Sequence, residues 1–375
     1  MSSDVFVAPM KVFHCDHCGS LVFFENTHCV SCGHLLAFLP DLLVLGSLDP
    51  VETSDLLWRS PLPAAAGRTY RLCANYRDAQ VCNWSVDADD DNPLCRSCRL
   101  TRVIPDQGVE GNQLAWYRLE VAKRRLLYTL LSLHLPIEGQ DDTDPRPAFE
   151  FLADDGRQAH VLTGHADGTI TINIAEADDA ERERRRTDLG EPYRTVLGHM
   201  RHEIGHYYWA QLVQAAPDRL TRFRDLFGND RLDYQAALQH HYKNGPSMDW
   251  QDHFISAYAS AHPWEDWAET WAHYLHMSDT LETAAACGVS LRPRHPDEPA
   301  LTGVPLDARK TRTPFDDLLE GWFPITYLLN NLNRGLGLAD AYPFVLSATV
   351  VEKLRFVHET IAAQTSARLR RRTPQ

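Results

Sequence analysis

The longest helical pattern in the sequence lies between Gly111 and Leu135. Apolar residues recur there at the spacing of one helix face: Leu114, Trp116, Tyr117, Leu119, Val121, Leu126, Leu127, Leu130 and Leu131. Pro136 follows directly, and proline does not continue a helix. The pattern therefore predicts a long helix, which opens the second domain.

A second helical pattern covers YRTVLGHMRHEIGHYYWAQL, from Tyr193 to Leu212. Its apolar positions are Val196, Leu197, Met200, Ile204, Tyr207, Tyr208 and Leu212, and they predict a buried helix. The same helix carries His202, Glu203 and His206, and buried polar side chains need partners. Gly205 costs about 1 kcal/mol against alanine inside a helix. We expect it to let another segment approach the backbone closely.

Two strands are predicted between these helices. AFEFLA, from Ala148 to Ala153, is one, and TITINIAEA, from Thr169 to Ala177, is the other, after the turn signal Asp167-Gly168. Polar and apolar residues alternate in the second strand, which predicts one buried face. This strand could hold an extended substrate by adding it to the sheet, or it could be a structural edge strand. The sequence leaves both readings open.

The C-terminal part is expected to be mainly helical. Pro263 stands where a helix would begin, and helical patterns run from Pro314 to Leu336 and from Thr349 to Gln364. We expect the last two helices to pack on the helix of His202. The Pro- and Arg-rich stretch from Leu291 to Thr313 is expected to be a loop, and Cys287 is expected to be buried and inert.

Eight of the nine cysteines form two groups in the N-terminal part of the chain. The first, Cys15, Cys18, Cys29 and Cys32, has the paired C-x-x-C spacing of a zinc ribbon with four thiolate ligands. The second, Cys73, Cys82, Cys95 and Cys98, is less regular, and we interpret it as another structural zinc site. Disulfides are the alternative, but such grouping without an export signal favours metal. The stretches Pro40 to Pro50 and Ser60 to Gly67 are expected to form an extended connector.

The strongest chemical signal is the H-E-x-x-H motif at residues 202–206. Residues four apart lie on one helix face, so His202 and His206 can bind one zinc ion. Glu203 is placed to take the proton from a water that the metal acidifies, which predicts hydrolysis of an amide bond. One alternative is an ordinary amphipathic helix. Another is a di-iron bundle, but that fold needs a second Glu-x-x-His, which is absent from this region.

A third ligand is expected from the helix that begins at Pro263. Glu265 and Glu269 lie one turn apart there, among several tryptophans, which favours burial over a solvated face. Glu265 can bind the metal, while Glu269 can accept a hydrogen bond from the far nitrogen of a ligand histidine and so fix its tautomer. Asp266 points away from this face and is expected to be structural.

Three other residues near these motifs allow two interpretations each. Tyr258 lies shortly before Glu265, and its phenol could donate a hydrogen bond to the oxyanion of the reaction or belong only to the core. His199 is interpreted as a core or supporting histidine. The sequence does not decide whether His199 or His273 contacts the metal.

Composition and charge narrow the classes of partner. The chain has 375 residues, enough for two or three domains, with 44% hydrophobic and 23% charged residues. Its net charge of −14 argues against a nucleic-acid partner. The basic residues of 365–375 are expected to form a solvated tail. No apolar run reaches membrane-spanning length, so we expect a cytoplasmic protein with no membrane contact.

These motifs resemble a known family. H-E-x-x-H followed by Glu265-x-x-x-Glu269 resembles the gluzincin metallopeptidases. The resemblance is closer to bacterial zinc-binding metallopeptidases with an N-terminal zinc ribbon, and it covers nearly the whole chain through the first cysteine group, CNWSV, CRSCRLTRVIP, GHMRHEIGHYYW, HPWEDWAETWAHYLH and DAYPFVL. It implies that His202, His206 and Glu265 are the ligands, Glu203 the base and Tyr258 the oxyanion donor.

We therefore expect an α+β protein. Residues 1–104 would form a zinc-ribbon module with four-cysteine sites at 15–32 and 73–98. Residues 111–364 would form a mainly α-helical, zincin-like metallopeptidase domain with a small β-sheet. About three zinc ions per chain are expected, one catalytic and two structural. The substrate would be a peptide or protein, and the ribbons could bind a protein partner. The alternative function is a catalytically inactive adaptor that binds proteins through its ribbons.

Overall fold

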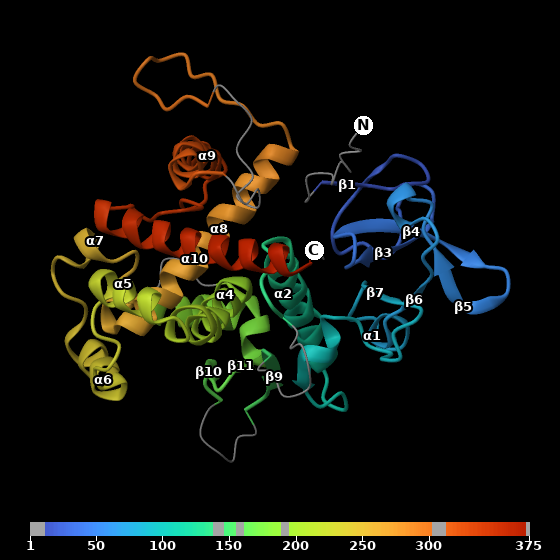
Figure 1. Ribbon diagram of the computed structural model, residues 1–375, viewed down its shortest axis with the longest axis horizontal. Helices are drawn as coiled ribbons and strands as arrows, with labels where there is room; N and C mark the ends of the chain where they lie inside the picture. Colours follow the sequence, from blue (N-terminus) through green and yellow to red (C-terminus); the bar gives the residue numbers. More distant parts are fainter. Residues whose placement is uncertain (1–11, 138–145, 155–160, 189–194, 302–312, 373–375) are drawn as a thin grey trace.

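The computed structural model describes residues 12–137, 146–154, 161–188, 195–301 and 313–372. The strand-rich N-terminal part lies on one side of the molecule and most helices lie on the other, with α2 (Asn112–Ser132) between them (Figure 1). No helix in these residues is long and apolar enough to cross a membrane. The architecture is α+β, as expected from the sequence.

The N-terminal part contains a two-stranded and a five-stranded antiparallel sheet. The first pairs β1 (Phe13–His14) with β2 (Leu21–Val22), which frame the first cysteine pair. The second has the order β3 (Leu35–Leu39), β4 (Val44–Val51), β5 (Ser54–Arg59), β6 (Tyr70–Leu72) and β7 (Ser85–Asp87). A short helix, α1 (Ala74–Arg77), follows β6.

The extended connector expected from Pro40 to Pro50 is not a connector. Its apolar residues form most of β4, which pairs with β3 in register Leu36 to Ser47 and buries Leu45 and Leu48. Strand pairing satisfies the backbone of this stretch, and burial stabilises its leucines. The second connector stretch contains a single 3-10 turn, Pro63–Ala65.

Helix α2 begins and ends close to its predicted bounds. Leu133 caps it, and the segment leaves the helix before Pro136. The Tyr128 ring packs against Phe24 and Phe38 of the N-terminal part, while its hydroxyl donates to Glu282 Oε1 at 2.6 Å. Helix α2 therefore contacts both halves of the molecule.

A four-stranded sheet lies beside the helices, in the order β10 (Gly164–Ala166), β11 (Thr169–Asn173), β9 (Ala148–Leu152) and β8 (Thr101–Val103). The second predicted strand ends four residues early, because the Asn173 side chain accepts from the Ala175 N–H and starts a 3-10 turn, Ile174–Ala177. Strand β11 lies between β10 and β9, so it is not an edge strand. In the described residues, β10 is the edge on that side.

After β11 and its 3-10 turn, the elements of the described residues are all helical. They are α3 (Asp179–Asp188), α4 (Val196–Tyr208) with a π-helical extension (Trp209–Gln214), α5 (Pro217–Phe227), α6 (Tyr234–Asn244), α7 (Trp250–His253), a 3-10 turn (Tyr258–Ala261), α8 (Pro263–Ala286), α9 (Phe315–Gly335) and α10 (Ala348–Arg372). Helices α4 and α8 cross the centre of this half (Figure 1).

Three expectations for the C-terminal part need correction. Helices α9 and α10 pack mainly against α8, and α10 also contacts the π-helical extension of α4. Helix α10 continues to Arg372, through most of the stretch expected to be a tail. Cys287 is exposed, because it caps the end of α8 at the surface. The loop expected from Leu291 to Thr313 is irregular where described, with one bridge from Leu291 to Leu301, and residues 302–312 lie outside the described residues.

Gly205 brings α4 and α8 into close contact, as its position in the helix predicted. A Cβ at residue 205 would lie 3.2 Å from the Ala268 Cα and 3.2 Å from Trp271 Cδ1. The Trp267 indole also donates to the Gly205 carbonyl at 2.8 Å. The close approach fixes the distance between the two helices.

Replacing Gly205 with alanine is expected to destabilise the protein by up to about 2 kcal/mol net, because backbone must move to admit the methyl group and such overpacking costs about 1–3 kcal/mol. This cost exceeds the gain of about 1 kcal/mol in helix propensity. Urea denaturation measures the change. Gly321→Ala is the matched control, since its Cβ would meet only Leu281 Cδ2 at an ordinary 3.5 Å. Equal stability of the two variants would contradict the proposed close contact.

Candidate metal centre

Helix α4 presents the two motif histidines on one face. Thr195 caps the helix, and its hydroxyl accepts from the Gly198 N–H at 2.9 Å. His202 and His206 lie one turn apart with ring centroids separated by 4.9 Å, and both are buried. The helix thus positions two imidazoles for one ion.

Helix α8 brings Glu265 to the same point. Pro263 stands in its first turn, and the His262 side chain caps it by accepting from the Trp264 N–H. Glu265 Oε2 lies 2.9 Å from His202 Nε2, and Glu265 Oε1 lies 3.6 Å from His206 Nε2. The potential ligand atoms of the three residues all lie within 4.8 Å of one another.

A metal ion fits this donor set. Glu265 is 1% exposed, and in the part of the chain that the structure describes its Oε2 has no partner beyond the 2.9 Å contact with His202 Nε2. Burial disfavours a charged His202, but Glu265 and Glu269 together raise its pKa well above the ordinary value. Burial lowers the pKa of His206 to about 3, so this imidazole stays neutral. The surroundings therefore favour one positive charge at this point, and two nitrogens with a carboxylate oxygen suit zinc.

Glu269 lies where the sequence placed it. Its Oε1 is 2.7 Å from His202 Nδ1, and its Oε2 accepts from the Ser256 hydroxyl at 2.6 Å. Glu269 can therefore hold the Nδ1 proton of His202, which leaves Nε2 facing Glu265. Burial alone would raise the pKa of Glu269, but its contacts with His202 and Ser256 outweigh burial and lower that pKa to about 2.

Glu203 and Tyr258 lie beside the cluster and are not part of it. Glu203 is buried, and burial with the nearby charges of Glu265 and Glu269 raises its pKa to about 7. The Tyr258 ring centroid lies 5.9 Å from that of His202. Burial, and next the charge of Glu265, raise the pKa of Tyr258 well above the ordinary value. Its phenol therefore keeps its proton and can act as a donor.

The sequence interpretation missed Ser256, which bonds to Glu269, and two further residues near the cluster. Tyr234, at the start of α6, donates to Glu265 Oε1 at 2.7 Å. The ring of His165, on β10, stacks against the ring of His206 with 6.0 Å between their centroids. His165 Nε2 accepts a hydrogen bond from the Gly168 N–H at 3.1 Å. Neither residue lies at a motif spacing from the H-E-x-x-H helix. Only the tertiary fold brings them there.

The other two histidines in question lie outside the cluster. His199 Nδ1 is 3.4 Å from Glu176 Oε2, and His273 Nδ1 is 2.9 Å from the Tyr342 hydroxyl. Asp266 faces away from the cluster and accepts from Lys353 Nζ at 2.6 Å in a buried ion pair. A buried network of Arg201, Asp279 and Thr129 further joins α4, α8 and α2.

Both cysteine groups come together in space. Cys15 Sγ lies 3.7 Å from Cys32 Sγ, and Cys82 Sγ lies 3.7 Å from Cys95 Sγ, and in each group all four sulfurs are within 4.8 Å. None of the eight forms a disulfide. The second group is fully buried, and Arg124 of α2 lies buried beside it.

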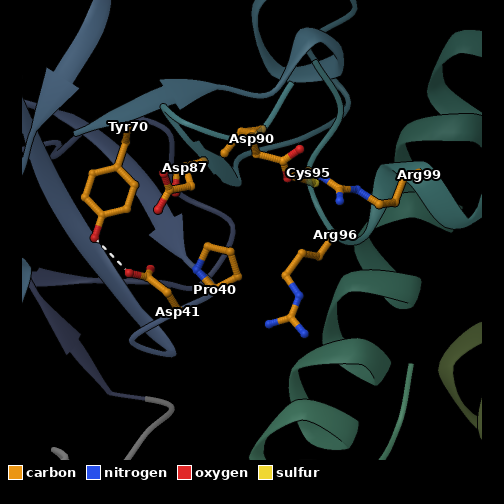
Figure 2. A pocket seen from close by; sticks show the side chains of 10 residues that line it. Pro40, Asp41, Tyr70, Asp87, Asp90, Cys95, Arg96 and Arg99 are labelled. Carbon is orange, nitrogen blue, oxygen red and sulfur yellow. Dashed lines mark hydrogen bonds and ion pairs between the residues drawn. The ribbon is translucent and has the colours of Figure 1, made fainter. Parts of the chain in front are cut away.

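A cavity of about 90 Å³ lies in the N-terminal part, away from the His-His-Glu cluster. Figure 2 shows Tyr70, which donates a hydrogen bond to Asp41, on one side of the cavity and Arg96 on the other side. Of the residues that line this cavity, Cys95 is the one that belongs to a cysteine group. Its position therefore associates it with the second cysteine group and not with the site on α4 and α8.

Comparison with known proteins agrees with both halves of this description. Residues 112–360 match the family described as "Putative zinc-binding metallo-peptidase", and residues 12–109 match a zinc-ribbon domain. Uncharacterized proteins of Mycobacterium bovis and of two Mycobacterium tuberculosis strains are 43% identical over 353 residues, which cover 94% of this chain and 95% of theirs. No solved structure matches. The chain belongs to this zinc-binding metallo-peptidase family and carries an N-terminal zinc-ribbon region.

Proposed function

We propose that the protein is a zinc-dependent peptide-bond hydrolase in which His202, His206 and Glu265 hold the catalytic zinc. The proposal rests on one observation. These three side chains come together in the protein interior, and Glu203 lies beside them. The two four-cysteine groups would hold two structural zinc ions, giving about three per chain.

The residues around the cluster have separate roles in this proposal. When bound, zinc supplies an acidified water and polarises the scissile carbonyl. Glu203 accepts the proton of that water and later passes it to the leaving amine. Tyr258 donates a hydrogen bond to the oxyanion that develops on the carbonyl oxygen. Glu269 orients His202, and Tyr234 orients Glu265 through its hydroxyl.

We place the peptide substrate along β10. The strand first considered for this role, β11, has both edges paired. Strand β10 pairs with β11 on one side, and its His165 reaches the ring of His206. An extended peptide on the outer edge of β10 would thus pass close to the cluster, with its backbone hydrogen-bonded to the sheet. We also place the protein in the cytoplasm, where thiolate zinc sites persist without forming disulfides.

An adaptor without activity remains the second candidate, because the N-terminal zinc-ribbon region could bind another protein. Glu203 distinguishes the hydrolase from the inactive adaptor. A zinc site with only a structural role needs no buried carboxylate beside it, and burying one is costly.

Zinc content per chain tests the proposed site. Elemental analysis should give about three zinc ions for the wild type and about two for His202→Ala and for Glu265→Gln. His273→Ala is the matched control, since His273 is a buried histidine of α8 bonded to Tyr342, and it should keep the wild-type count. Wild-type counts in His202→Ala and Glu265→Gln would refute the metal site and leave the adaptor.

The rate of hydrolysis is expected to fall as pH is lowered through the pKa of Glu203. The raised pKa of about 7 means that the carboxyl becomes protonated below that pH and can no longer accept a proton. Bound zinc favours the carboxylate, so we expect the acid midpoint between about pH 5 and 7, with kcat falling about tenfold per pH unit below it. A pH profile of kcat measures this, with zinc content checked at each pH. A flat profile across this range would contradict the role of Glu203.

A further inference from the structure

Ser256 connects two parts of the proposed site that lie on different elements. It is 7% exposed and precedes the 3-10 turn Tyr258–Ala261. Its hydroxyl donates to Glu269 Oε2 at 2.6 Å and accepts from the Ala259 N–H at 3.1 Å. One hydroxyl thus uses both its donor and an acceptor position.

Each of these hydrogen bonds leads to a residue with a proposed role. Through Glu269 the hydroxyl acts on His202, because the other carboxylate oxygen lies 2.7 Å from His202 Nδ1. Through the Ala259 N–H it holds the turn that carries Tyr258. A carboxylate with both oxygens bonded cannot rotate without breaking one bond, so Ser256 fixes the plane of Glu269.

We propose that Ser256 is a positioning residue that sets both the orientation of the zinc ligand His202 and the position of the oxyanion donor Tyr258. The inference rests on the proposed function. It predicts that one substitution weakens zinc binding and slows catalysis through two separable routes.

The test uses Ser256→Ala in the full chain, with Ser260→Ala as the matched control. Ser260 belongs to the same turn, but its hydroxyl donates to the Ala257 carbonyl and touches neither Glu269 nor His202. Competition with a graded chelator series, followed by elemental analysis, measures the affinity for the zinc ion that His202→Ala lacks. We expect Ser256→Ala to weaken it about tenfold and Ser260→Ala to leave it unchanged. Ser256→Thr, which keeps the hydroxyl, should restore most of the affinity.

Double mutants separate the two routes. If Ser256 acts on zinc through Glu269, Ser256→Ala should not weaken zinc binding further in a Glu269→Ala background. If it acts on the rate through Tyr258, Ser256→Ala at saturating zinc should lower kcat several-fold with little change in KM. That loss should largely disappear in a Tyr258→Phe background.

The zinc measurement requires no peptidase activity, so it tests the inference separately from the proposed hydrolysis. An unchanged zinc affinity in Ser256→Ala, or an effect that simply adds to that of Glu269→Ala, would overturn the inference. Equal losses in Ser256→Ala and Ser260→Ala would also overturn it, because they would indicate only a general loosening of the turn. If the zinc results hold while no variant and no wild type cleaves peptides, the hydrolytic function fails and the positioning role of Ser256 stands.

Discussion

Replacing Glu203 with glutamine is expected to lower kcat about 10²- to 10⁴-fold while zinc content stays at the wild-type value. Glutamine has the size of glutamate but cannot accept the proton of the attacking water. Glu203 lies outside the group of ligand atoms formed by His202, His206 and Glu265, so its loss should not release the metal. Hydrolysis of casein, with elemental analysis of the same samples, measures both quantities.

Glu282→Gln is the control for this experiment. Glu282 is a buried carboxylate of α8 that accepts a hydrogen bond from the Tyr128 hydroxyl, and it is not among the clustered ligand residues His202, His206 and Glu265. We expect its kcat to remain within a few-fold of the wild type. An active Glu203→Gln enzyme would remove Glu203 from the mechanism. Loss of zinc in Glu203→Gln would show that Glu203 helps to hold the metal.

Replacing Cys95 with serine is expected to unfold the N-terminal part. In small zinc modules the metal contributes on the order of 10–16 kcal/mol, which is comparable to the whole stability of a domain. Cys95 is 1% exposed, and the buried charge of Arg124 lies beside its group. Without the thiolates and their metal, that charge loses its compensation, which costs several kcal/mol more.

Two further cysteine substitutions serve as comparisons for Cys95→Ser. Cys18→Ser removes a proposed ligand of the first group at an exposed position, so we expect loss of one zinc ion with a smaller loss of stability. Cys287→Ser changes an exposed cysteine at the end of α8 and should alter neither quantity. Zinc content, thermal unfolding and limited proteolysis measure the outcome. A Cys95→Ser protein with wild-type stability would show that the second group is not a structural metal site.

The parts of the site that could be predicted from the sequence are those with fixed local spacing. The histidines of α4 and the carboxylates of α8 follow helix geometry, so their faces were predictable before their contacts were known. The paired cysteines are equally local. The contact of Glu269 with His202 Nδ1 agrees with the expectation for that residue, and its role in orienting the ligand stays a prediction.

The parts that could not be predicted depend on tertiary contacts or on strand pairing. Tyr234 reaches Glu265 from a separate helix, and no spacing rule connects them. Strand β4 was mistaken for a connector, because proline and aspartate are typical of turns and a strand is stabilised mainly by its neighbours. The exposure of Cys287 follows from where α8 ends in space, which residue type alone does not determine.

Helix α2 makes the two halves of the protein depend on each other. Tyr128 packs on Phe24 and Phe38 of one half and bonds Glu282 of the other, while Gln113 donates to the Ala79 carbonyl. A chain shortened to residues 112–360 would expose this aromatic face to water, and a fragment of residues 12–109 would lose its cover. We therefore expect the two segments to fold, and to be produced and purified in soluble form, only as one chain. The mycobacterial relatives match this chain across both segments, which agrees with that dependence.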